Sequence, residues 1–251
     1  MPRFLVGTAS WAVPRDHAGA FPPPDSGSAL ARYARVLPCC EINSTFWRRH
    51  RASTFERWHA TVPRAFRFAV KLPRTITHEG ELTRPRPLLQ EFFADVAPLG
   101  EKLGPVLVQL PPSLAFEPRR VGAFFRNLRA LHAGPIACEP RHPSWYGPKA
   151  HALLVSFDVA RVAADPPRPG DARDPAGSAS LVYHRLHGSP RPYYSEYGED
   201  RVAAIVERLR AAPPKATVWC IYDNTASGAA AGDALRAVRM LIQPRGCASR
   251  C

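Results

Sequence analysis

Short apolar runs recur along the whole chain, and each is followed by a turn and then by a helical pattern. Several of these runs are apolar nearly throughout, as expected for parallel strands that are buried on both faces. Prolines follow several runs, and since proline cannot continue a central strand it marks the point where a strand ends. The predicted strands span residues 4–9, 39–45, 66–72, 105–110, 135–139, 161–164, 180–187 and 216–222.

Helical patterns lie between these strands, at residues 28–37, 53–60, 87–97, 118–131, 148–155, 199–211 and 229–242. Eight strands and seven helices in 251 residues match an α/β fold of the (β/α)8 TIM-like barrel type, with one βα unit lacking a regular helix. The rival is an open doubly wound sheet. No Gly-x-Gly-x-x-Gly fingerprint or Walker phosphate loop follows any strand, so the barrel is preferred.

Residues 165–179 interrupt the alternation, because this Pro/Gly/Asp-rich segment has no helical period. A loop of this length predicts a weakly ordered lid that closes over the barrel when a ligand binds. We predict one barrel domain over residues 1–243 and a disordered tail over 244–251.

Composition places the chain among soluble globular proteins, since 45% of its residues are apolar. No apolar run approaches the roughly 18 residues needed to cross a bilayer, so no membrane association is predicted. The first residues read as a strand and lack the apolar run of a signal peptide. A cytoplasmic location is therefore expected, and the oligomeric state is left open.

The formal charge of +13 suggests nucleic acid as a partner. The arginines that carry most of this charge are scattered, however, and the longest basic run is Arg48-Arg49-His50-Arg51. A diffuse, solvated basic surface is therefore preferred to a polyanion groove.

The six cysteines point to reduced thiols. Cys39, Cys40, Cys138 and Cys220 lie in apolar strand-like segments, where a thiol acts as a small hydrophobe. No Cys-x-x-Cys pair is present, which argues against a structural zinc site. Cys247 and Cys251 belong to the predicted tail.

Polar side chains gather where the predicted strands end. In a barrel all these ends open on one rim, where the active sites of this fold lie. Period two places Glu41, Asn43 and Thr45 on one face of their strand, and Arg185 and His187 on one face of theirs. The strand-end set is Glu41, Asn43, Lys71, Gln109, Glu139, Arg141, Asp165, Arg185, His187 and Asn224.

Charged residues at the ends of apolar strands favour catalysis, because burying them unpaired would cost several kcal/mol each. We predict acid/base roles for Glu41, Glu139, His142 and His187. The predicted substrate-binding residues are Asn43, Lys71, His78, Gln109, Arg141, Trp145, Asp165, Arg185, Tyr194 and Asn224. The alternative is a buried ion-pair network that only closes the top of the barrel.

Three cations, Lys71, Arg141 and Arg185, face two carboxylates in this set, which predicts a bound anion. The preferred function is a metal-independent acid/base enzyme, of hydrolase or lyase type and without a cofactor, acting on a small anionic or sugar-like substrate. The cations would already neutralise the carboxylates, and this argues against a metal ion.

Two alternatives stay open. A glycoside hydrolase would use Glu41 and Glu139 as its two carboxylates. A protein that binds or processes single-stranded nucleic acid would use the positive charge and the aromatic residues at the rim.

Six motifs in fixed order resemble the YecE-like family, also known as domain of unknown function 72, over residues 3–242. They are Gly7-Thr8-Ala9-Ser10-Trp11, Glu41-Ile42-Asn43-Ser44-Thr45-Phe46, Ile76-Thr77-His78, Gln109-Leu110-Pro111-Pro112, Glu139-Pro140-Arg141-His142-Pro143-Ser144-Trp145 and Arg185-Leu186-His187-Gly188. The resemblance implies a TIM barrel and no particular reaction. Ala9 and Asp223 depart from the family pattern, and the second departure favours Asn224 over residue 223 as a functional residue.

Overall fold

The structure is a computed structural model that describes residues 2–167 and 174–243. Its strands form one sheet in the order β7-β9-β10-β1-β2-β3-β4-β5-β6-β8, and all neighbours are parallel except β6 and β8. The strands are β1 (Arg3–Ala9), β2 (Cys39–Ile42), β3 (Arg67–Lys71), β4 (Leu103–Gln109), β5 (Ile136–Glu139), β6 (Val159–Arg161), β7 (Ala163–Asp165), β8 (Ala176–Gly177), β9 (Leu181–Leu186) and β10 (Thr217–Tyr222).

Strands β6 and β7 are two parts of one segment, separated only by Val162. Strand β6 pairs with β5 and β7 pairs with β9, so this segment closes the sheet into a ring. Counted as one strand, it gives the eight parallel strands of a TIM-like barrel, each matching a predicted strand. The two-residue β8 lies antiparallel beside β6 as an addition to the ring. The predicted fold is confirmed.

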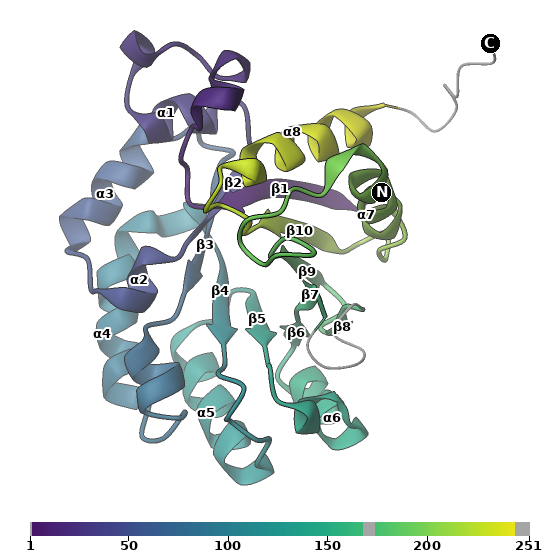
Figure 1. Ribbon diagram of the computed structural model, residues 1–251. Coiled ribbons are helices and arrows are strands. Elements are labelled where there is room, and N and C mark those ends of the chain that lie inside the picture. The colour runs from purple at the N-terminus through teal and green to yellow at the C-terminus, as the bar shows by residue number, and fades with distance from the viewer. Residues whose placement is uncertain (1, 168–173, 244–251) are drawn as a thin grey trace.

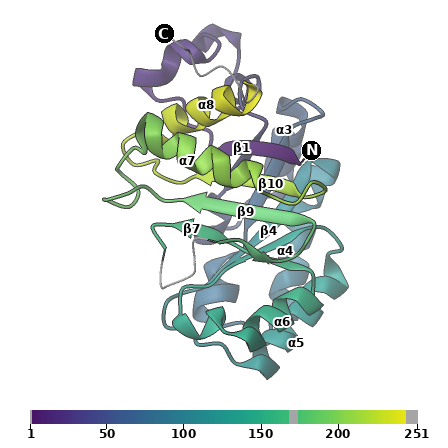
Figure 2. The same cartoon turned by 90° about the vertical axis from the view of Figure 1, so that its right-hand side faces the viewer.

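The helices lie outside this ring (Figures 1 and 2). The α-helices are α1 (Ala29–Ala34), α2 (Ser44–Trp47), α3 (Ala52–Thr61), α4 (Arg86–Val96), α5 (Pro118–Leu131), α6 (Pro148–Ser156), α7 (Gly198–Arg210) and α8 (Ala229–Ile242). Short 3-10 helices are η1 (Arg15–Ala20), η2 (Pro24–Ser26), η4 (Ala97–Lys102) and η5 (Pro143–Tyr146), and η3 (Thr75–Glu79) is a π-helix. Prolines begin α5, η5 and α6, as suits a residue without an N–H group.

The strands bury both faces. Residues facing the helices join one large apolar cluster, and alternate strand residues form a second cluster inside the ring. Small side chains such as Ala69, Ala137 and Ala160 make room there for the stacked rings of Tyr183 and Trp219, whose centroids are 6.0 Å apart. The interior of the barrel is therefore a packed core. The side chains at the C-terminal ends of the strands are placed to contact a substrate.

One predicted strand boundary is wrong. Strand β2 ends at Ile42, Asn43 has helical backbone angles, and α2 begins at Ser44. Thr45 therefore does not share a strand face with Glu41. Its hydroxyl donates a 2.6 Å hydrogen bond to the carbonyl oxygen of Lys71, which ties α2 to the end of β3.

The structure also bears on the predictions about membrane spans and cysteines. No helix among the described residues is long and apolar enough to cross a membrane. Cys39, Cys40, Cys138 and Cys220 are buried free thiols, and burial raises the pKa of each of them. Residues 168–173 of the predicted lid and the predicted tail at 244–251, with its two cysteines, lie outside the described residues.

Candidate functional site

Arg185, near the end of β9, lies at the centre of a buried cluster of charges at the mouth of the barrel. Its side chain is 1% exposed and binds three carboxylates. Nε and Nη2 donate to Glu41 over 3.1 and 2.7 Å, Nη1 donates to Glu139 over 2.5 Å, and Nη2 also donates to Asp223 over 2.9 Å. Glu41 is the third residue of β2, Glu139 ends β5 and Asp223 follows β10, so the arginine links strands across the ring.

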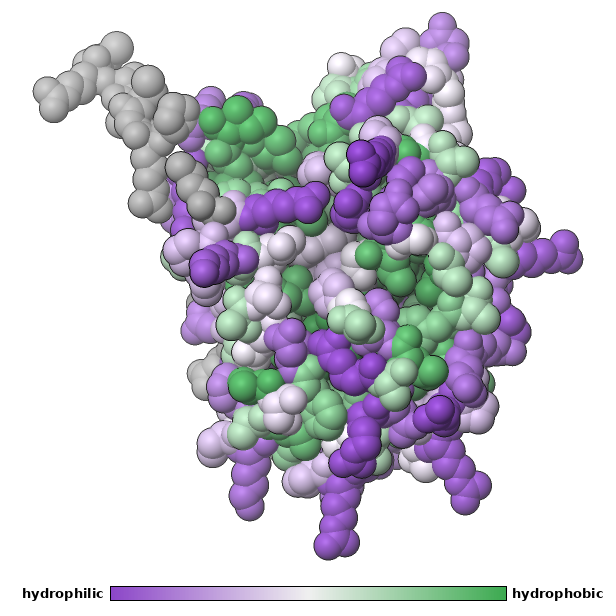
Figure 3. Space-filling model, turned by 180° about the vertical axis from the view of Figure 1, so that it is seen from behind, coloured by the Kyte–Doolittle hydropathy of each residue, from purple (hydrophilic) through white to green (hydrophobic). Residues whose placement is uncertain are grey.

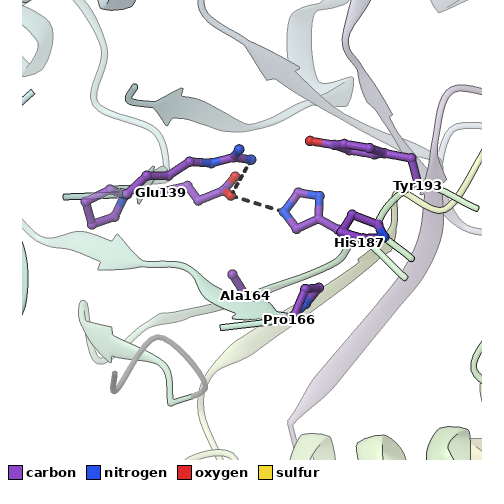
Figure 4. Close-up of a pocket in the computed structure, with 8 residues that line it drawn as sticks. Glu139, Ala164, Pro166, His187 and Tyr193 are labelled. Atoms are coloured by element: carbon purple, nitrogen blue, oxygen red, sulfur yellow. Dashed lines mark hydrogen bonds and ion pairs between the residues drawn. The ribbon is translucent and has the colours of Figure 1, made fainter. Parts of the chain in front are cut away.

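His187 lies between two of these carboxylates. Its Nε2 is 3.1 Å from Glu139 Oε1 and its Nδ1 is 3.0 Å from Asp223 Oδ2. A neutral imidazole could donate to only one of them, so the geometry fits the imidazolium form. Burial alone would lower the pKa of His187, but the charge of Glu139 and the two hydrogen bonds outweigh it and raise the pKa. Figure 4 shows the imidazole directed toward Glu139.

Glu139 is also held by Arg141, whose Nη2 donates to Oε1 over 3.1 Å. Burial would raise the pKa of Glu139, but Arg185, His187 and Arg141 outweigh this effect and hold the pKa well below its usual range. Arg141 is 17% exposed, whereas Arg185 is almost completely buried. Arg141 is therefore the guanidinium group of this cluster that an incoming molecule can reach.

A pocket of about 330 Å³, part of it open to solvent, lies against this cluster. Tyr193 forms one side of it and is 42% exposed, with its ring 5.7 Å from the imidazole of His187. Figure 4 shows the ring of Tyr193 above the imidazole, with Ala164 and Pro166 on the other side. The lining residues are Glu139, Pro140, Arg141, Ala164, Pro166, His187, Pro192 and Tyr193.

The sequence analysis missed two members of the cluster. Tyr183 donates its hydroxyl to Glu41 Oε2 over 2.7 Å. Asp223 accepts from both Arg185 and His187, whereas Asn224, which the family pattern favoured, donates to Ser195 and Asp233 instead. The preference for residue 224 over residue 223 is corrected as far as this cluster is concerned.

Asp223 also corrects the charge count. Three carboxylates now face Lys71, Arg141, Arg185 and the imidazolium of His187, so the predicted surplus of one positive charge remains only while Lys71 holds its proton. The sign of the local charge then depends on whether His187 and Lys71 hold protons.

Lys71 ends β3 and is 9% exposed. Its Nζ lies 3.8 Å from the centroid of the Phe46 ring, and it makes no ion pair or hydrogen bond within residues 2–167 and 174–243. Burial and the positive charge of Arg185 lower its pKa to about 8, although Glu139, Glu41 and Asp223 oppose the shift. Lys71 is thus a buried amine without a fixed carboxylate partner.

Three further predicted residues lie near the ends of β2, β3 and β4. His78 packs edge-on against Phe46 at 4.9 Å, and burial together with Lys71 and Arg141 lowers its pKa to about 4. Asn43 has a buried Oδ1 that accepts no hydrogen bond from the described residues. Gln109 donates to the carbonyl oxygen of Leu110 over 2.9 Å.

Four predicted residues have other partners in the structure. His142 caps η5 by accepting from the N–H of Ser144, and buried Trp145 donates to the carbonyl oxygen of Leu114 over 2.9 Å. Tyr194 packs against Arg191, and Asp165 accepts from the hydroxyl of Tyr197. None of the four hydrogen-bonds to Arg185, His187 or their carboxylates in the described structure. Their roles toward a substrate stay predictions.

The carboxylates of the mouth are poorly suited to a metal ion, because arginine and histidine donors already occupy their oxygens. No group of three His, Cys, Asp or Glu side chains in the described ranges could hold a metal ion.

A family model described as "Protein of unknown function DUF72" matches residues 5–249 of the chain. The protein YecE of Escherichia coli K12 is 32% identical over 120 residues, which cover 47% of this chain and 43% of that protein. YunF of Bacillus subtilis is 26% identical over 198 residues, which cover 73% of this chain and 69% of that protein. The match to YecE thus spans less than half of its length.

Solved structures support the same fold. A DUF72 family protein from Enterococcus faecalis superposes with a TM-score of 0.81 at 23% identity, covering 97% of both chains. One from Thermotoga maritima gives 0.78 at 22% identity, covering 96% of this chain and 100% of that one. A 3-keto-D-glucoside 4-epimerase from E. coli gives 0.57 at 13% identity over 96% of this chain and 99% of that one, a likeness of fold alone.

Proposed function

The chain belongs to the DUF72 family, and from the residues at the mouth of its barrel we propose that it is an acid/base enzyme for a small sugar-like or anionic substrate, working without a metal ion. The observation that carries the proposal is Lys71, a buried amine with no carboxylate partner among the described residues, at the same mouth as the imidazolium of His187. An amine whose pKa is lowered to about 8 and an imidazole whose pKa is raised are a base and an acid of the kind that proton transfer needs.

Lys71 is the candidate base. Its pKa of about 8 leaves an appreciable neutral fraction near neutral pH, and a neutral amine can accept a proton from a carbon or hydroxyl group. His187 is the candidate acid, because two carboxylates keep it charged and aim both of its N–H groups. The imidazole lines the pocket, and a substrate oxygen bound there can take its proton by replacing one of the two carboxylates that its N–H groups now contact.

Glu41 and Glu139 fit a positioning role better than the acid/base role predicted from the sequence. Both accept hydrogen bonds from Arg185, and the lowered pKa of Glu139 keeps it ionised. The same pairing disfavours a glycoside hydrolase, since the general acid in that chemistry must hold a proton.

The substrate class follows from the reachable donors. Arg141 and Tyr193 line the pocket, and a guanidinium group beside a phenol suits an oxygen that carries or develops negative charge. When Lys71 is neutral, three carboxylates balance Arg141, Arg185 and the imidazolium of His187, so a substrate with several hydroxyl groups and at most one anionic group fits better than a multiply charged one.

Deuterium exchange tests this proposal without knowledge of the product. Ketoses, ketoglycosides, sugar acids and sugar phosphates that raise the melting temperature are selected first, since a ligand of the native state stabilises it. Each is then incubated with the protein in D2O, and mass spectrometry measures deuterium incorporated at carbon. We expect incorporation that Lys71→Met or His187→Gln lowers about a hundredfold to ten-thousandfold.

The matched control is Lys149→Met, which changes an exposed lysine in the first turn of α6. It should leave both ligand binding and exchange unchanged. Exchange that persists in Lys71→Met would exclude the lysine as the base. If no member of the panel stabilises the wild-type protein, the substrate class is wrong.

A further inference from the structure

A second pocket lies at the opposite end of the barrel, where the strands begin. It has a volume of about 730 Å³, part of it open to solvent, and is lined by the first residues of β1, β3, β4, β9 and β10. Figure 3 shows this end of the molecule, with hydrophilic side chains projecting around its edge and paler and apolar residues between them. It shares no residue with the pocket at the mouth.

Three cations, Arg3, Arg67 and Lys215, line this pocket, and no acidic residue does. Arg67 donates to the carbonyl oxygens of Arg64 and Phe66. Arg3 and Lys215 make no side-chain hydrogen bond or ion pair with the described part of the chain. Some surface arginines elsewhere have carboxylate partners, as in the 2.7 Å pair of Arg239 with Glu199. Arg3 and Lys215 are therefore available to bind an external anion.

The floor of the pocket is apolar and closed. It consists of Leu5, Leu181 and Trp219, which are all buried in the core inside the barrel. The indole ring lies against Gly104, since a Cβ there would be 2.6 Å from Cζ2 of Trp219. Glycine at this position thus lets the edge of the indole ring pack against β4 at the base of the pocket, where a ligand would meet apolar side chains.

We propose that this pocket binds a small organic anion with a flat apolar body, such as an aromatic carboxylate. The carboxylate pairs with Arg3 and Lys215 at the rim, and the ring lies on the floor formed by Leu5, Leu181 and Trp219. The ligand needs both its carboxylate and its ring. An inorganic anion would make no contact with the apolar floor, and a neutral ring would leave the cations unpaired.

The test uses naphthoate as the probe and naphthamide as its neutral analogue of the same shape. Protein labelled with fluorotryptophan is titrated with each and followed by fluorine NMR. The Trp219 resonance, assigned by its loss in Trp219→Phe, should shift with naphthoate. Calorimetric titration of the unlabelled protein gives the affinities and needs no assignment, should that variant fail to fold.

The double variant Arg3→Gln/Lys215→Gln changes two exposed side chains and should fold normally. We expect it to bind naphthoate about tenfold more weakly, as the loss of two partly solvated charge pairs implies. Wild-type protein should bind naphthamide about tenfold more weakly than it binds naphthoate. The control Arg119→Gln/Lys149→Gln removes two charges at the starts of α5 and α6, near the other end of the barrel, and should bind like wild type.

Equal affinity for naphthoate and naphthamide would overturn the proposal, since the cations would then contribute nothing. Unchanged binding by the double variant, or no naphthoate binding at all, would overturn it as well. A single-stranded oligonucleotide that binds far more tightly than naphthoate, and is lost in the double variant, would make this surface a polyanion site instead.

Discussion

The two sides of the barrel mouth differ in how their charges are satisfied. On one side, Arg185 and His187, at the end of β9, are fixed by carboxylates of β2, β5 and the residue after β10 through hydrogen bonds of 2.5–3.1 Å. At the ends of β2 and β3, Lys71 lies on the ring of Phe46 without a carboxylate, and Asn43 has a buried oxygen without a donor, among the residues described. The first side is here called the paired side and the second the unpaired side.

The difference separates rigidity from reactivity. A group that is fully engaged within the protein can position other groups, but it offers little to an incoming molecule. A buried group without a partner has a perturbed pKa and gains free energy when a substrate satisfies it. Substitutions on the two sides should therefore change stability in opposite directions.

The largest effect is expected for Arg185→Met on the paired side. The change leaves the carboxylates of Glu41, Glu139 and Asp223 buried without their common cation. Breaking a buried pair in this way costs about 3–5 kcal/mol of unfolding free energy. Urea unfolding of the variant against wild type measures it.

The control for Arg185→Met is Arg239→Gln, which breaks a pair with Glu199 whose side chains are both more than half exposed. Such surface pairs contribute at most about 1 kcal/mol. If both variants lost equally little stability, the paired side would not be a structural centre.

A smaller loss is expected for Glu139→Gln. The amide keeps the shape and one acceptor oxygen, but it removes the charge that Arg185, Arg141 and His187 share. Weakening hydrogen bonds to charged groups should cost about 2–3 kcal/mol. An unchanged or raised melting temperature would instead mark Glu139 as a strained catalytic group.

His187→Gln should show how the paired side depends on pH. The folded protein raises the pKa of His187, so its protonation stabilises the fold below the unfolded pKa of 6.5, and this contribution is lost as pH rises through the folded value. The variant should therefore lose about 1–2 kcal/mol near pH 6 and less in alkaline buffer. Unfolding curves at several pH values measure the difference, and a loss that grows with pH would contradict the pairing.

An effect of similar size but opposite sign is expected for Lys71→Met on the unpaired side. The folded state lowers the pKa of Lys71 from 10.5 to about 8, so below pH 8 the wild-type protein buries a charge that its unfolded chain would solvate. The variant should be about 1–2 kcal/mol more stable than wild type at neutral pH. This advantage should disappear between pH 8 and pH 10.5, where the native amine has lost its proton. A destabilised variant would mean that Lys71 has a structural partner.

The sequence predicted the barrel because its signals are local. Parallel strands buried on both faces are apolar runs, and prolines end them, so all eight were found. The end of β2 was misplaced because period two alone cannot reveal a chain reversal. Asn43 and Ser44 follow Ile42 without a proline or glycine, and the turn into α2 depends on contacts such as that of Thr45 with Lys71, far along the chain.

The site was predicted less completely, because the sequence shows which side chains end the strands and not which of them meet. Tyr183 could have been found, since it lies two residues before Arg185 and shares its strand face. Asp223 was set aside on a family pattern, although its position at the end of β10 gave it the same claim as Glu139. Arg185 binds three carboxylates, whereas Lys71 binds none among the described residues. This difference depends on how the ring of strands closes, which the sequence does not show.

The cluster around Arg185 also bears on how the protein is made. Glu41 precedes its partner Arg185 by 144 residues, so Glu41 is synthesised long before Arg185. A nascent chain that has completed only β1 to β4 holds Glu41 without the arginine that binds it in the folded barrel, so water must solvate this carboxylate. Closure of the barrel thus requires β9. The first third of the chain therefore reaches its native form only after the last third has been synthesised.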